Sequence, residues 1–250
     1  MKTVLISGCS YAVNITEKHS KPVFEDYFND KVDWHNISET GSSPTKSINR
    51  CYEWTAIHGF PDLLIMPISH LHRYELPIAN CDQLYDTPSL SWNQGKKLDK
   101  ESYQNNISPL IGYNDLQKYL QIQNKIDSMN MSYCSNLVRD LVGFATWLKM
   151  KECRHLIFNM SNDFKYMQSK NTDQGLEKLH WLKTTRNVYK FFEFSGNEWL
   201  WNQLNDTEKQ KLEDYEIGLS NPGAVHHTHE SYAKLMQYLI KEILETNLDK

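Results

Sequence analysis

Short apolar segments alternate with amphipathic ones over the first part of the chain. Apolar segments over 3–6, 32–37 and 62–68 predict strands, and amphipathic segments over 22–29 and 44–58 predict helices. The second helix has a clear start, because Ser43 offers a capping hydroxyl and Pro44 fits the first helical position. The segment 62–68 is apolar almost throughout, as is typical of a parallel strand buried on both faces. This order of elements predicts a doubly wound parallel sheet.

The periodicity weakens between about 70 and 130, where prolines and glycines interrupt polar stretches. We expect an inserted cap there, with one helix over 115–126. Beyond it, the pattern predicts helices over 131–150 and 229–244, strands over 155–160 and 188–194, and one or two short helices within 197–215. The predicted fold class is an α/β protein, a three-layer α/β/α sandwich with a parallel sheet. Residues 1–250 are expected to form a single domain, with the cap at about 70–130 as an insertion.

The composition limits the classes of partner. The chain has 250 residues, is 40% hydrophobic and carries a formal net charge of −4, with acidic and basic side chains interspersed. Such a surface has no long-range field to recruit nucleic acid or a membrane, so neither partner is expected. The five cysteines are far apart and form no C-x-x-C pair, which predicts neither a disulfide framework nor a zinc site. No window approaches the ~18 apolar residues of a membrane span, and we expect a cytoplasmic protein.

The segment Ser7-Gly8-Cys9-Ser10 follows the first predicted strand directly. It imitates a lipoprotein cleavage box, but the apolar run before it is shorter than the roughly 7–15 residues of a signal peptide, so we interpret it as a tight turn. The turn places Ser10 at the carboxyl end of a central strand, where α/β proteins bind their ligands. A serine there becomes a nucleophile if a base accepts its proton and fixed N–H groups receive the oxyanion.

Two later segments offer candidates for those roles. Thr40-Gly41-Ser42-Ser43 follows the second predicted strand and opens a helix, so its N–H groups are expected to point into the same crevice as Ser10. Residues 226–229 read His-His-Thr-His and precede the last helix, for which Thr228 is the expected cap. No Cys, Asp or Glu accompanies these histidines at ligand spacing, so a metal site is not expected.

In this order of motifs the chain resembles the SGNH (GDSL-type) hydrolase superfamily, and the resemblance spans nearly the whole chain. Gly8-Cys9-Ser10 stands where that family has Gly-Asp-Ser, which implies that Ser10 is the nucleophile and that its N–H helps to form the oxyanion hole. Gly41 matches the second family block and implies another backbone donor. His226 precedes the final helix and is the implied general base. The resemblance also implies a flavodoxin-like, SGNH-hydrolase-like fold.

The chain departs from the family pattern at two blocks. The third block, normally Gly-x-Asn-Asp, reads Pro67-Ile68-Ser69-His70, so the side-chain oxyanion donor is missing or is replaced by Ser69, His70 or the nearby Arg73. Gly223 stands where the family has the Asp that orients the histidine. The site is then a Ser-His dyad, or it takes an acid from elsewhere, such as Asp214 or Glu216. Slow turnover is expected, because the amide version of that Asp in a serine protease costs ~10⁴ in rate.

The prediction is a serine hydrolase that uses no cofactor and cleaves a small acyl ester on a carbohydrate-like or lipid-like alcohol. Ser10 and His226 are the catalytic pair, and the oxyanion hole comprises Ser10, Gly41 and Ser69. His70, Arg73 and His229 are assigned to the substrate, and His229 is the alternative base if the loop register differs. Acyl transfer to an alcohol is the nearest chemical variant.

The rival from another class is a catalytically inactive protein of this fold that binds a ligand or partner in the crevice. A nucleotide-binding protein is a third hypothesis, disfavoured by the absence of G-x-G-x-x-G and of a P-loop lysine. The oligomeric state is not indicated.

Overall fold

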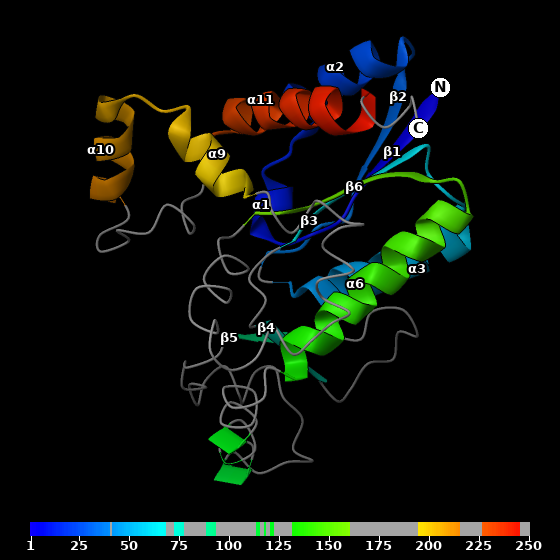
Figure 1. Ribbon diagram of the computed structural model, residues 1–250, viewed down its shortest axis with the longest axis vertical. Helices are drawn as coiled ribbons and strands as arrows, with labels where there is room; N and C mark the ends of the chain where they lie inside the picture. Colours follow the sequence, from blue (N-terminus) through cyan, green and yellow to red (C-terminus); the bar gives the residue numbers. More distant parts are fainter. Residues whose placement is uncertain are drawn as a thin grey trace.

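The computed structural model (Figure 1) describes residues 1–40, 42–68, 73–77, 89–93, 114–115, 118, 121–122, 132–160, 195–215 and 227–245. Its strands are β1 (Lys2–Ile6), β2 (Val32–Asn36), β3 (Leu63–Ile68), β4 (Arg73–Pro77), β5 (Ser89–Asn93) and β6 (Arg154–Asn159). Its helices are α1 (Ser10–Val13), α2 (Glu17–Phe28), α3 (Pro44–His58), α6 (Ser132–Met150), α9 (Gly196–Asn202), α10 (Asp206–Tyr215) and α11 (His229–Leu239), which the π-helical turn η4 (Ile240–Glu245) continues.

Among the described residues, four parallel strands form the central sheet in the order β2-β1-β3-β6. Helices α2 and α11 pack together on one side of the sheet, and α3 and α6 pack together on the other (Figure 1). The molecule is therefore a three-layer α/β/α sandwich with a parallel sheet, and this prediction is confirmed. The order of strands is that of a flavodoxin-like or SGNH-like sandwich.

The sequence pattern explains the centre of the sheet. All six residues of β3 are buried, as the continuous apolar run predicts for a strand covered on both faces. Helix α3 begins and ends where its sequence signals stand: the Ser43 hydroxyl accepts from the Lys46 N–H at 3.1 Å, and Gly59 follows the last residue with φ of 82°. A glycine adopts that left-handed φ without the steric cost that a Cβ would add.

Helix α2 is longer than predicted, because it begins at Glu17 rather than at Pro22. Proline lacks the N–H that would bond to the preceding turn, which is why the pattern places the start there. In the structure the Ser20 N–H donates to the Thr16 carbonyl at 2.9 Å and starts the helix one turn earlier. Phe24, fully buried in the core, anchors the segment that follows the proline.

Most of the predicted cap lies outside the described residues. The described part of it includes β4 and β5, which pair antiparallel in a sheet separate from the central one. Residues 115, 118 and 121–122, inside the predicted helix over 115–126, are helical, and so is residue 114 directly before it. The predicted fifth strand over 188–194 lies outside the described residues, so it remains a prediction.

The described cysteines are buried thiols. Cys9, Cys51 and Cys153 are free, and burial raises the pKa of both Cys51 and Cys153 to about 12. Those two thiols stay protonated at neutral pH, which makes them poor nucleophiles. Within the part of the chain that the structure describes, no helix has the length and apolar character needed to cross a membrane.

His155 makes the stability of the fold depend on pH. Burial lowers the pKa of this β6 histidine, against the opposing effect of the Cys153 carbonyl, which lies 3.0 Å from Nδ1. The unfolded chain therefore binds a proton more readily than the folded one, so the free energy of unfolding should fall as the pH drops below about 6.5. Urea titrations between pH 8 and 5 should show this loss, and His155→Gln should flatten the slope. Equal slopes for both proteins would contradict the assignment.

Candidate functional site

The carboxyl ends of β1 and β3 lie side by side at one edge of the sheet. β1 lies between β2 and β3; α2, which joins β1 to β2, covers one side of the sheet, and α6, which precedes β6, covers the other (Figure 1). Ligands of open α/β sheets bind at such a switch point, where diverging loops leave a crevice. Ser10 follows β1 at this point as the first residue of α1. The topology thus places the candidate nucleophile where its position in the sequence predicts.

The turn that carries Ser10 is packed tightly against its neighbours. The Ser7 N–H donates to the Ile65 carbonyl at 3.0 Å, and the Ser7 hydroxyl donates to the Ser47 carbonyl at 2.9 Å. Gly8 has no room for a side chain, because a Cβ there would lie 2.6 Å from the Ala12 Cβ. Ser10 is partly exposed, whereas its neighbours Cys9 and Tyr11 are buried. The tightly packed turn therefore holds Ser10 in place and leaves its side chain accessible to solvent.

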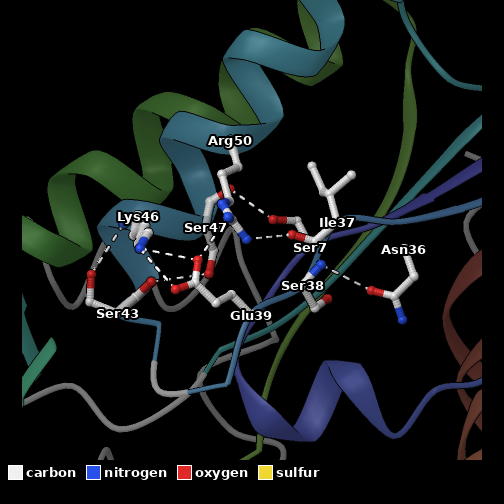
Figure 2. Close-up of polar contacts among 9 residues, drawn as sticks. All are labelled: Ser7, Asn36, Ile37, Ser38, Glu39, Ser43, Lys46, Ser47 and Arg50. Atoms are coloured by element: carbon white, nitrogen blue, oxygen red, sulfur yellow. Dashed lines mark hydrogen bonds and ion pairs between the residues drawn. The ribbon is translucent and has the colours of Figure 1, made fainter. Parts of the chain in front are cut away.

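Asn36, the last residue of β2, ties the next loop to α1. Its side-chain N–H groups donate to the carbonyls of Ala12 at 3.0 Å and Ile15 at 3.1 Å. Its side-chain oxygen accepts from the Ser38 N–H at 3.0 Å, a bond drawn in Figure 2. One amide therefore fixes the far end of α1 and the start of the loop after β2 together.

Glu39 connects that loop to the turn that carries Ser10 and to α3. Its N–H donates to the Gly8 carbonyl at 3.0 Å, and its own carbonyl accepts from the Ser42 N–H at 3.1 Å. Its carboxylate lies 3.1 Å from Lys46 Nζ and 2.7 Å from Arg50 Nη2 (Figure 2). Gly41, the predicted oxyanion donor, lies outside the described residues, but Glu39 and Ser42 on either side of it are held in place.

The start of α11 lies against α1. Thr228 caps α11 as predicted, accepting from the Ser231 N–H at 3.3 Å. His229 Nδ1 lies 3.0 Å from the carbonyl oxygen of Asn14, a residue 215 positions away. A carbonyl oxygen only accepts, so this contact requires the proton of His229 to sit on Nδ1. The His229 ring also stacks on His19, with ring centroids 5.8 Å apart.

A buried tyrosine of α11 lies close to α1. Tyr232 of α11 is fully buried, and burial raises the pKa of its hydroxyl well above the ordinary value. The neighbouring Tyr11 and Cys9 raise that pKa further, while the Asn14 side chain and the His227 backbone lower it in part. Tyr232 therefore lies near residues at both ends of α1.

The predicted site residues are only partly described. Ser10 and His229 both lie at α1, one at its start and the other at the residue that ends it. Arg73 begins β4 and Asp214 lies in α10, but the side chains of both are outside the described part of the structure. The remaining predicted site residues lie wholly outside the described residues: Gly41, Ser69, His70, Glu216 and His226. The roles assigned to them remain predictions. Sequence reasoning missed Asn36 and Glu39, whose importance comes from contacts with distant segments.

No protein-family model matches the chain, and no curated protein matches it in sequence. Among the described residues, no group of three His, Cys, Asp or Glu side chains is placed to hold a metal ion. The chemistry of the site is therefore inferred from the fold and from the contacts around Ser10.

Proposed function

We propose that this chain is a serine ester hydrolase of the SGNH type, acting on a small acyl ester of a carbohydrate-like or lipid-like alcohol. One observation carries the proposal: the start of α11 lies against the helix that Ser10 begins, through the 3.0 Å contact of its first residue, His229, with Asn14. Chain order alone does not bring a late histidine segment to an early serine. The contact supports a Ser-His pair built across the two ends of the chain.

In the proposed reaction Ser10 Oγ attacks the ester carbonyl while His226 accepts its proton. The N–H groups of Ser10 and Gly41 hold the tetrahedral oxyanion, with Ser69 as an additional donor. His226 returns the proton to the departing alcohol, and a water activated by the same imidazole then releases the acid from the acyl enzyme. Asp214 or Glu216 orients the imidazole, or the site works as a dyad. His70 and Arg73 are assigned to the substrate.

The geometry of His229 favours His226 as the base. Backbone carbonyls of a helix point toward its carboxyl end, and the Asn14 carbonyl that His229 contacts stands at that end of α1. Ser10 stands at the opposite end. His229 also has its ring stacked on His19 of α2, so it serves to dock the segment. His226 is three positions earlier in the sequence than this docking residue.

A fluorophosphonate probe tests the proposal directly. The probe should label the wild-type protein, peptide mass analysis should place the adduct on Ser10, and Ser10→Ala should abolish labelling because the attacking oxygen is gone. The same wild-type protein should hydrolyse p-nitrophenyl acetate. A folded wild-type protein that is neither labelled at high probe concentration nor active on the ester would overturn the proposal, in favour of a catalytically inactive protein that binds a ligand or partner in the crevice.

A further inference from the structure

Glu39 is the point at which three segments of the candidate site are joined. Its main-chain N–H binds the Gly8 carbonyl at 3.0 Å, and its main-chain carbonyl binds the Ser42 N–H at 3.1 Å. Its carboxylate binds two cations of α3, Lys46 and Arg50 (Figure 2). Through one residue, the turn before Ser10, the loop after β2 and the first turns of α3 are therefore held in a fixed relation.

The lysine in this network has an unfavourable position by itself. Lys46 lies in the first turn of α3, where the positive end of the helix dipole disfavours a cation, and its side chain is only 10% exposed. A buried ammonium group needs a counter-charge, and the Glu39 carboxylate supplies it. Arg50 stands one helical turn further on and binds the same carboxylate at 2.7 Å, while also donating to the Ile37 carbonyl at 2.9 Å. The two cations give the carboxylate a two-point anchor.

The position of the anchor matters for the chemistry. Gly41 is two residues after Glu39, and Ser10 is two residues after Gly8, the partner of the Glu39 N–H. The two N–H groups of an oxyanion hole must converge on one oxygen, and a misplacement of about 1 Å can cost ~100-fold in rate. The Glu39 to Gly8 bond links the two loops that carry these groups.

We propose that Glu39 is a positioning residue of the active site. Its anchored carboxylate holds the loop after β2, whose sequence includes Gly41, in place beside the turn that carries Ser10. The inference rests on the proposed hydrolase function. It differs from a purely structural role for the ion pairs, because a structural pair affects the stability of the fold and leaves the turnover of the folded enzyme unchanged. A positioning role lowers kcat even in a variant whose stability has been restored.

Two variants separate these roles. Glu39→Gln leaves Lys46 buried without an anion, so it should lower both the melting temperature and kcat. Glu39→Gln combined with Lys46→Met removes the carboxylate together with the more buried of its two cations and fills the space with a flexible apolar chain, so stability should recover; Arg50 keeps its bond to the Ile37 carbonyl. We expect kcat for p-nitrophenyl acetate to stay lower by about 10-fold to about 100-fold in the double variant, with KM within about twofold of wild type.

Glu17→Gln is the matched control, because Glu17 also pairs with a lysine, Lys21, at 2.8 Å, but on the exposed side of α2 away from both loops. It should keep wild-type kcat. A double variant with wild-type stability and wild-type kcat would overturn the positioning role while leaving the hydrolase proposal intact. A wild-type protein that neither reacts with the fluorophosphonate probe nor hydrolyses the ester would overturn the hydrolase proposal and this inference with it.

Discussion

Replacing Gly8 with alanine should lower the free energy of unfolding by about 3 kcal/mol, at the upper end of what overpacking costs. The added Cβ would lie 2.6 Å from the Ala12 Cβ and 3.1 Å from the Pro67 carbonyl oxygen. Both atoms belong to or sit directly on backbone, so neither can rotate away. Relief requires α1 to move away from β3, and Ser10 moves with it. Activity of the folded fraction should therefore fall as well, measured as kcat at a temperature below the melting transition.

Gly143 provides the matched control for this substitution. It lies in the exposed middle of α6, and a Cβ added there meets nothing within 4 Å. Gly143→Ala should leave activity unchanged and stabilise the protein by up to about 1 kcal/mol, because alanine is the better helix former. Urea unfolding of the two variants measures both effects. A Gly8→Ala protein as stable as Gly143→Ala would show that α1 can shift freely, contrary to the packing described above.

Local patterns predicted the layers of the fold because the deciding signals are close together in the sequence. The apolar run of β3 needs only its own composition to indicate burial on both faces. Ser43 and Pro44 are adjacent, and together they specify the start of α3. The start of α2 was placed wrongly because Pro22 is a strong local signal against a helix. The packing of Phe24 in the core offset that local preference, and this packing is not visible in the pattern.

Only those parts of the candidate site that depend on neighbouring residues in the sequence could be predicted. Ser10 follows a strand and a glycine, so its place at the carboxyl edge comes from adjacent residues. Glu39 acts through Gly8 and Arg50, which belong to other segments of the chain. Arg50 lies on α3, but its side chain is only 25% exposed and donates to the Ile37 carbonyl after β2, a contact that no local pattern indicates. Tyr232 follows the apolar spacing of α11, which explains its burial but not its place beside Tyr11.

These contacts explain how the loops around Ser10 can be ordered although two blocks of the SGNH pattern are absent from the sequence. Asn36 and Glu39 each join the loop after β2 to the chain around Ser10, one at the end of α1 and one at Gly8. His229 fixes the late segment to the same short helix. A catalytic geometry depends on such supporting contacts as much as on the reacting groups, because each supporting bond removes a way for the loops to drift. Under the proposed function, the departures from the SGNH pattern therefore bear on the rate of the reaction more than on the arrangement of the described loops.

Replacing His226 with alanine should lower kcat/KM for p-nitrophenyl acetate by about 10³-fold, within the range that loss of a general base produces. Ser10 then has no imidazole to take its proton, and labelling by the fluorophosphonate probe should slow in parallel. KM should change little, because the imidazole acts on the proton of the attacking serine in the transition state. Steady-state kinetics and the labelling rate at pH 8 measure both effects.

His229→Ala is the matched comparison, three positions away in the same segment. It removes the 3.0 Å contact with Asn14 and the stacking on His19, so it should cost about 1 kcal/mol of stability and lower kcat by less than about tenfold through looser docking of the segment. The opposite ranking, with His229→Ala nearly inactive and His226→Ala active, would move the base to His229. In that case the Nδ1 contact with Asn14 would orient the imidazole, doing for the catalytic ring what the family's Asp does where Gly223 now stands.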